Sequence, residues 1–176
     1  MPRARLDTRS RTRITRADLK RLARIAWEER EDFFSRHPEW GLLYRKRLLC
    51  SALCKGAALH YLNGASGVDG FEVWSFYAEH AEAPYPHRFS SRRDFGTAKF
   101  GPDPLSGVYT GRRVELTGRS LRCHPADDPV ESLLRYLHRG ATPVARGLRK
   151  QAVVLIEPEP YLGYVVWPTL VTRAHR

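Results

Sequence analysis

Hydrophobic and polar positions change their period several times along the chain, which predicts a mixture of helices and strands. Between residues 16 and 36, apolar side chains such as Leu19, Leu22 and Ile25 recur at the spacing of one helix face. Thr15 and Asp18 precede this run as a capping box in which Asp takes the usual place of Glu. We therefore expect a helix over residues 16–36 that stops near the following proline, residue 38.

Strict alternation of large apolar and polar residues over 71–77 predicts the clearest strand of the chain. One face of that strand carries Glu72, Trp74 and Phe76, so a carboxylate shares a face with two large aromatic rings. Three further strands are expected over residues 48–53, 109–116 and 164–167.

Cap and stop signals predict three more helices. The first covers residues 58–62 and ends at an Asn-Gly pair, and the second runs from an Asp-Asp-Pro start at 127–129 to a glycine at 140. The third opens at Thr142-Pro143 and leads into an apolar run at 152–156, which periodicity assigns to neither helix nor strand. Without internal repeats or a second composition regime, the chain reads as one α/β (α+β) domain over residues 15–176. We expect a small mixed sheet with flanking helices.

Residues 1–14 differ from the rest because they are arginine, threonine, serine and proline with almost nothing apolar. Eight of the first 24 residues are arginine, and such a segment buries too little to offset its ordering entropy. We expect a flexible, Arg-rich arm that is available to a protein partner.

The formal net charge of +11 favours a polyanionic partner such as nucleic acid, a nucleotide or an acidic protein, although an arginine-rich proteome gives basic proteins without any such role. Three cysteines without framework spacing indicate free thiols in a reducing, cytoplasmic setting. No apolar run reaches the length of a membrane span, and no secretory signal is visible. The histidines lack zinc-ligand spacing, and neither a phosphate-binding P-loop nor a serine nucleophile elbow is present.

A long irregular stretch over residues 81–107 carries basic and aromatic residues in alternation: Arg88, Phe89, Arg92, Arg93, Phe95, Lys99 and Phe100. This pattern suits phosphate contacts with base stacking. The alternative is that the aromatic rings pin the loop to the core and leave the arginines in solvent. Its Asp-Phe-Gly triplet at 94–96 matches kinases by letters only, because no glycine-rich loop or catalytic-loop motif accompanies it.

Three elements stand in an order that suits phosphoryl chemistry. A strand breaks at Lys55-Gly56-Ala57 and enters a helix, whose unpaired N–H groups favour an anion. Two later strands carry Glu72 and Glu115, and carboxylates on neighbouring strands can share Mg²⁺ with substrate phosphates. A pair of such metals would activate the attacking oxygen and stabilise the leaving one.

This order resembles the nucleotidyltransferase superfamily, the polymerase-beta-like fold, over roughly residues 45–120. In that family a Gly-Ser turn follows the first strand, the next strand bears two acids one residue apart, and a later strand bears a third. The resemblance implies a nucleotide-binding, Mg²⁺-dependent transferase. Its catalytic and metal-binding residues would be Glu72, Glu115 and Asp69, and the nucleotide phosphates would meet Lys55, Gly56, Ala57, Arg113 and Lys99.

The chain departs from that pattern in two places. The first acid of the pair falls at Gly70, and Asp69 is one residue off, which puts it on the other face unless a bulge at Gly70 corrects it. Ala57 replaces the serine of the turn. A structural interpretation therefore stays open, in which Arg113 pairs with Glu72, Arg112 or Arg119 neutralises Glu115, and the Lys55 turn is only a connector.

Three functions remain open at this point. The first is a nucleotidyltransferase that acts on a protein, a small molecule or an RNA end. The second is a catalytically degenerate relative that keeps a nucleotide or nucleic-acid surface. The third is a basic interaction protein, such as a toxin–antitoxin or defence component, whose arm orders on an acidic partner.

Overall fold

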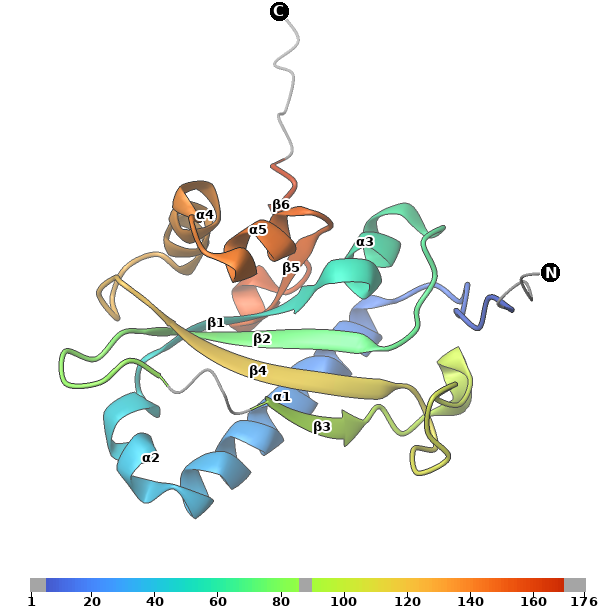
Figure 1. The fold of residues 1–176 in the computed structure, drawn as a ribbon, viewed down its shortest axis with the longest axis horizontal. Helices are drawn as coiled ribbons and strands as arrows, with labels where there is room; N and C mark the ends of the chain where they lie inside the picture. Colours follow the sequence, from blue (N-terminus) through green and yellow to red (C-terminus); the bar gives the residue numbers. More distant parts are fainter. Residues whose placement is uncertain (1–5, 86–89, 170–176) are drawn as a thin grey trace, which may run out of the picture.

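The computed structural model describes residues 6–85 and 90–169 of the 176-residue chain, and these form a mixed α+β fold (Figure 1). Its helices are α1 (Arg16–Arg36), α2 (Pro38–Tyr44), α3 (Lys55–Asn63), α4 (Pro129–Arg139) and α5 (Pro143–Arg149), with 3-10 turns η1 (Ala98–Phe100) and η2 (Glu159–Tyr161). Its strands are β1 (Leu48–Cys54), β2 (Phe71–Ala78), β3 (Ser90–Asp94), β4 (Arg113–Leu121), β5 (Val153–Glu157) and β6 (Val165–Trp167). They form one sheet in the order β3-β4-β2-β1-β5-β6, in which β2 and β4 are parallel and every other neighbouring pair is antiparallel.

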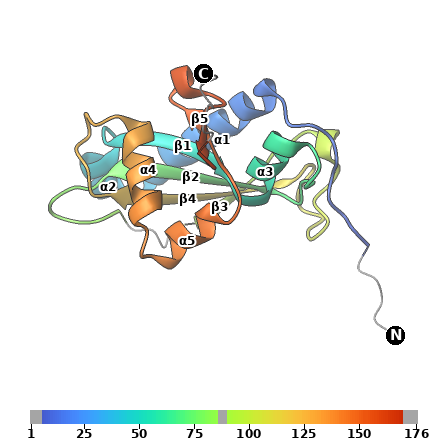
Figure 2. The same ribbon diagram turned by 90° about the horizontal axis from the view of Figure 1, so that it is seen from above.

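Helices cover both faces of this sheet. Figure 2 shows α1 on one side of the strands and α4 with α5 on the other. The alternation expected for β2 is confirmed, because Phe71 and Val73 join the core under α1, whereas Trp74 and Phe76 join the core under α4. The predicted small mixed sheet with flanking helices is therefore what the chain forms.

Helix α1 begins at the predicted capping box. The Thr15 hydroxyl accepts the Asp18 N–H at 3.4 Å, and the Asp18 carboxylate accepts the Thr15 N–H at 2.7 Å. The helix ends before Pro38 as expected, but Pro38 also opens α2, which the sequence analysis did not predict. Proline is favoured in the first turn of a helix because it has no N–H to leave unpaired there.

The predicted irregular stretch contains a strand. Residues of β3 pair antiparallel with β4 and form one edge of the sheet. Strand β4 itself runs over Arg113–Leu121 and not over 109–116, because the Thr110 and Gly111 N–H groups bond to the Asp94 carboxylate at 2.7 and 2.9 Å instead of to a strand. The ambiguous apolar run after α5 is strand β5, held between β1 and β6.

The Asp-Phe-Gly triplet has a structural explanation at each position. Asp94 holds the ends of the loop that follows it, since it also accepts the Gly96 N–H at 2.8 Å. Phe95 is buried and stacks on Phe71 with ring centroids 4.9 Å apart. Gly96 has a φ of +84°, a conformation that glycine adopts without strain. The letters therefore describe a loop closure and carry no kinase chemistry.

Residues 6–14, which the sequence places in the Arg-rich arm, lie against the domain; residues 1–5 are outside the described range. Ser10 and Val68 exchange two backbone hydrogen bonds of 2.9 and 2.8 Å. The Arg112 guanidinium donates to the Thr8 carbonyl at 2.9 Å, and Ile14 is buried in the core under α1. These contacts bring the start of the described chain to the loop that precedes β2.

Two simpler expectations can also be compared with the structure. All three cysteines carry free thiols as predicted, and burial raises the pKa of the Cys50 and Cys54 thiols, which makes them poor nucleophiles. Within the described ranges, no helix has both the length and the apolar composition needed to cross a bilayer.

Candidate functional site

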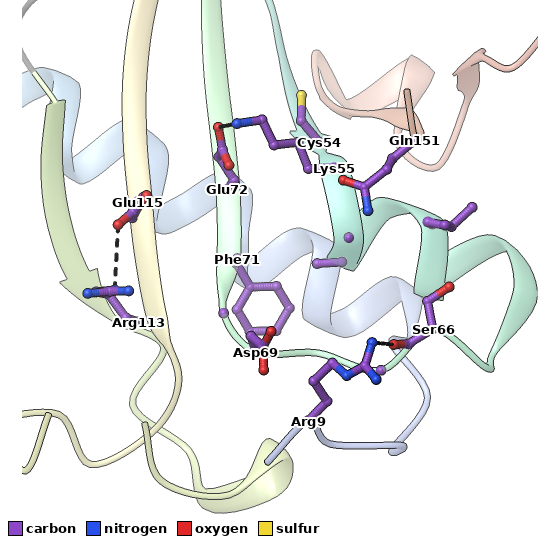
Figure 3. Close-up of a pocket in the computed structure, with 15 residues that line it drawn as sticks. Arg9, Cys54, Lys55, Ser66, Asp69, Phe71, Glu72, Arg113, Glu115 and Gln151 are labelled. Atoms are coloured by element: carbon purple, nitrogen blue, oxygen red, sulfur yellow. Dashed lines mark hydrogen bonds and ion pairs between the residues drawn. The ribbon is translucent and has the colours of Figure 1, made fainter. Parts of the chain in front are cut away.

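A cavity of about 530 Å³ opens where β1 ends and where β2 and β4 begin, beside the first turn of α3 (Figure 3). Most of the residues singled out by the sequence lie around it, namely Lys55, Gly56, Ala57, Asp69, Gly70, Glu72, Arg113 and Glu115. Arg9 and Gln151 complete its polar wall. Segments far apart in the sequence therefore meet at one polar hollow.

The two predicted carboxylates are direct neighbours in the sheet. Glu72 of β2 is the register partner of Glu115 of β4, and the two strands are parallel. Their neighbours Phe71 and Val114 are buried in the core under α1, so both carboxylates point to the opposite face and into the cavity. A metal ion shared by these two carboxylates requires this proximity, which the strand register provides.

Basic side chains already neutralise both carboxylates. The Lys55 ammonium lies 2.9 Å from the Glu72 carboxylate, which also accepts the Trp74 indole N–H at 3.0 Å. The Glu115 carboxylate lies 3.5 Å from Arg92 and 3.6 Å from Arg113. The expected Arg113 partner of Glu72 was therefore wrong.

The arginines expected to neutralise Glu115 are engaged elsewhere. Arg112 is buried and donates to backbone carbonyls, including that of Phe100 at 2.7 Å. Arg119 lies with its guanidinium carbon 5.5 Å from the centre of the Tyr136 ring. Their sequence proximity to Glu115 did not identify their partners, because Arg112 bonds to backbone carbonyls and Arg119 contacts the Tyr136 ring.

The turn at the start of α3 leaves its backbone open toward the cavity. Lys55 has a φ of +58°, unusual for a residue with a side chain, and its N–H donates to the Ala152 carbonyl at 3.0 Å. The preceding Cys54 makes no side-chain capping bond to the first turn. A Cβ atom placed on Gly56 would meet only the Gln151 amide nitrogen, at 3.7 Å. Ala57, by contrast, is buried in the core under α1.

Position 70 has no room for the acid that the resemblance expects. A Cβ atom on Gly70 would lie 2.9 Å from the Arg113 carbonyl oxygen. Asp69 is exposed in the loop before β2, and β2 pairs with β4 from Phe71 onward without a register shift, so no bulge turns Asp69 inward. Among the described residues, no three His, Cys, Asp or Glu side chains gather to hold a metal ion. The described structure therefore pairs Glu72 with Glu115 and leaves Asp69 at the cavity rim, without the three-carboxylate cluster that the resemblance implies.

The basic stretch contributes little to this cavity. Lys99 pairs with Asp18 at the start of α1 and does not line the hollow. Phe95 and Phe100 are buried against Phe71, as the alternative interpretation held. Arg93 pairs with Asp32, and the candidates Arg88 and Phe89 lie outside the described residues.

Sequence reasoning missed two residues of the site. Arg9 reaches the cavity wall and donates to the Ser66 carbonyl at 3.1 Å. Its guanidinium also binds Asp7, and these hydrogen bonds hold the pKa of the Asp7 carboxyl well below its usual range. Gln151 enters from the connection between α5 and β5. Neither residue stands in a motif, so no local signal could have identified them.

Comparisons with protein-family models, with curated proteins and with solved structures found no match for this chain. The resemblance to the nucleotidyltransferase superfamily therefore stays a prediction that depends on the residues around this cavity.

Proposed function

We propose that the cavity binds a nucleoside triphosphate together with Mg²⁺ and that the protein transfers a nucleotidyl group from it. The observation that supports this most strongly is the register pairing of Glu72 with Glu115 at the rim of a turn with an open backbone. Chemistry on phosphates needs oxygen ligands for a cation next to a seat for anions. Both kinds of group line this one hollow.

The anion seat consists of a helix start and three cations. The first N–H groups of α3 lack intrahelical acceptors, and the helix dipole adds partial positive charge there. Lys55, Arg9 and Arg113 surround the same space. A bound triphosphate would draw the Lys55 ammonium away from Glu72, because both groups line the cavity and the pair is partly exposed to solvent.

The residues present fit Mg²⁺ without a third protein acid. This ion is commonly held by one or two carboxylates together with substrate phosphates, and Glu72 and Glu115 are such a pair. When bound there it would neutralise phosphate charge. Lys55 and the Gly56 N–H would orient the phosphates.

Isothermal titration of ATP, GTP, CTP and UTP, with and without Mg²⁺, tests the proposal. The matched variant is Glu72→Gln/Glu115→Gln, which keeps side-chain size and removes both charges. We expect Mg²⁺-dependent binding in the wild type and at least tenfold weaker binding in the variant. Binding that ignores both Mg²⁺ and the substitutions would refute the carboxylate pair as a metal site.

A second function is nucleotide binding without transfer. It is favoured by the lack of room at Gly70, where the Arg113 carbonyl leaves no place for the first acid of the usual pair. It predicts the same titration result but no release of pyrophosphate from bound nucleotide. Pyrophosphate release that is lost in the Glu72→Gln/Glu115→Gln variant would rule this second function out.

A further inference from the structure

A second hollow lies on the same face of the sheet as the cavity, at the far end of β4. It has a volume of about 480 Å³ and runs between β4 and the C-terminal half of α4. Four arginines line it, Arg119, Arg122, Arg135 and Arg139, against one acid, Glu79. We call it the arginine groove. Its arginines come from α4 and from the end of β4 with the residue that follows it, and they form no sequence motif.

The positive charge of the arginine groove is largely uncompensated. Only Arg122 faces an acid, with its Nε 3.8 Å from the Glu79 carboxylate, and its side chain is almost fully exposed. In the described part of the chain, no carboxylate forms an ion pair with Arg119, Arg135 or Arg139. Like charges held together cost repulsion, which an external anion relieves.

A tyrosine ring in the arginine groove favours a nucleic-acid strand over an acidic peptide as the bound anion. Tyr136 is half-buried on α4 and lines the groove, and the Arg119 guanidinium carbon lies over one face of its ring, 5.5 Å from the ring centre. Proteins that bind a single nucleic-acid strand commonly combine basic side chains, which contact the phosphates, with aromatic rings on which bases stack. An acidic peptide has no base to place on that ring.

The groove and the cavity share one row of side chains. Glu115, Thr117 and Arg119 alternate onto the same face of β4, since Val114 and Leu116 are buried on the other. Arg119 lies four residues along the strand from Glu115, about 13 Å, a distance that about four nucleotide steps of a stacked strand would span. A strand held in the groove could therefore extend one end into the cavity.

We infer that the arginine groove binds a single nucleic-acid strand and that this strand is the acceptor. A hydroxyl at its end would form the new bond to the α-phosphorus of the bound triphosphate as the bond to the β-phosphate breaks and pyrophosphate leaves. The acceptor role rests on the proposed function, whereas strand binding does not. The competing structural explanation is that Arg139 only stabilises the C-terminal dipole of α4, which would leave binding unaffected.

Fluorescence anisotropy with labelled U12 RNA and dT12 DNA tests the inference. The variant is Arg135→Gln/Arg139→Gln. Both positions are exposed on α4, and glutamine favours a helix about as well as arginine does, so α4 should stay folded. The matched control is Lys20→Gln/Arg24→Gln, two exposed cations on α1 across the sheet. We expect the groove variant to bind about tenfold more weakly, and its slope of log affinity against log salt to flatten by about 1.4, or about 0.7 per lost contact. The control should match the wild type.

Each other outcome would overturn strand binding. The wild type could bind neither oligonucleotide, or it could bind poly-glutamate of matched charge with the same affinity. The α1 control could lose as much oligonucleotide affinity as the groove variant, or the groove variant could keep the salt slope of the wild type. The Glu72→Gln/Glu115→Gln variant separates the two proposals, because it should lose nucleotide and keep U12. An oligonucleotide that binds in the groove but never gains a labelled nucleotide, while pyrophosphate is still released from bound nucleotide, would refute only the acceptor role. Absence of both would refute the proposed transfer instead.

Discussion

Two ion pairs, one on each side of the sheet, use the same chemistry in different surroundings. Under α1, the Arg30 guanidinium donates two hydrogen bonds of 2.8 and 2.9 Å to the Glu157 carboxylate. The side chains of Arg30 and Glu157 are only 7% and 19% exposed. At the cavity, Lys55 meets Glu72 through one contact of 2.9 Å, and those side chains are 43% and 23% exposed. The first pair is enclosed, and the second is open to solvent.

The surroundings of each pair indicate which of them can be exchanged. Arg30 also donates to the Ser51 and Ser75 hydroxyls at 3.1 and 3.3 Å, so both terminal nitrogens of its guanidinium have acceptors inside the protein. A buried charge whose partner is removed is costly to leave alone. The Lys55 ammonium can leave Glu72 for another anion at little cost in free energy, because the pair is partly exposed and water solvates both charges. The enclosed pair therefore stabilises the fold, while the open pair is suited to binding.

The largest effect is expected at the enclosed pair. Arg30→Met should lower the free energy of unfolding by about 3–5 kcal/mol, because Glu157 is left without its counter-charge. Urea unfolding at pH 7 measures this loss. The double variant Arg30→Met/Glu157→Gln should recover part of it, and a loss below about 1 kcal/mol in the single variant would contradict the comparison.

At the open pair, binding should change more than stability. Lys55→Gln should alter the free energy of unfolding by no more than about 1 kcal/mol and weaken nucleotide binding about tenfold, which corresponds to about 1.4 kcal/mol. Lys55→Arg, which keeps the charge, is the control in the same titration. A variant that unfolds easily while binding nucleotide normally would reverse the roles that we assign to the two pairs.

Asp94 adds a third case to the comparison of the two ion pairs, because backbone N–H groups stabilise its carboxylate instead of a cation. Burial alone would raise the pKa of Asp94, but hydrogen bonds from Thr110, Gly111 and Gly96 outweigh it and lower that pKa. A lowered pKa stabilises the fold above the unfolded value of about 3.9, and this stabilisation is lost as the pH falls through the folded value.

Asp94→Asn should therefore cost about 1 kcal/mol of unfolding free energy at pH 7, with a gap to the wild type that narrows below about pH 4. Urea unfolding at pH 7, 5, 4 and 3 gives both curves, and other carboxylates titrate alike in the two proteins. A gap that widens toward low pH would show that the sign is wrong.

The smallest effect on stability is expected at the cavity turn, where stability and binding should move in opposite directions. Gly56→Ala should raise the free energy of unfolding by about 0.5 kcal/mol, since alanine favours the helix and the new Cβ meets only Gln151. The same methyl group narrows the approach of a phosphate to the backbone, so nucleotide binding should weaken in calorimetry. Gly147→Ala in α5, where a Cβ meets nothing, is the matched control.

Local patterns were enough for most elements of the fold. The capping box of α1, the alternation of β2 and the Asp-Pro start of α4 each depend on residues a few positions apart, and each was confirmed. Strand β3 and helix α2 were missed because their signals are weak. β3 is polar and forms only by pairing along the edge of β4, and α2 is a seven-residue helix.

The sequence by itself determined a basic α+β chain with free thiols and named most of the residues around the cavity. Only the tertiary structure decided which of them meet. The parallel register set Glu72 beside Glu115, the Arg113 carbonyl closed position 70, and the docking of residues 6–14 brought Arg9 to the rim. Sequence periods report which face a side chain takes on its own element, whereas proximity between elements depends on strand order and register, which long-range packing sets.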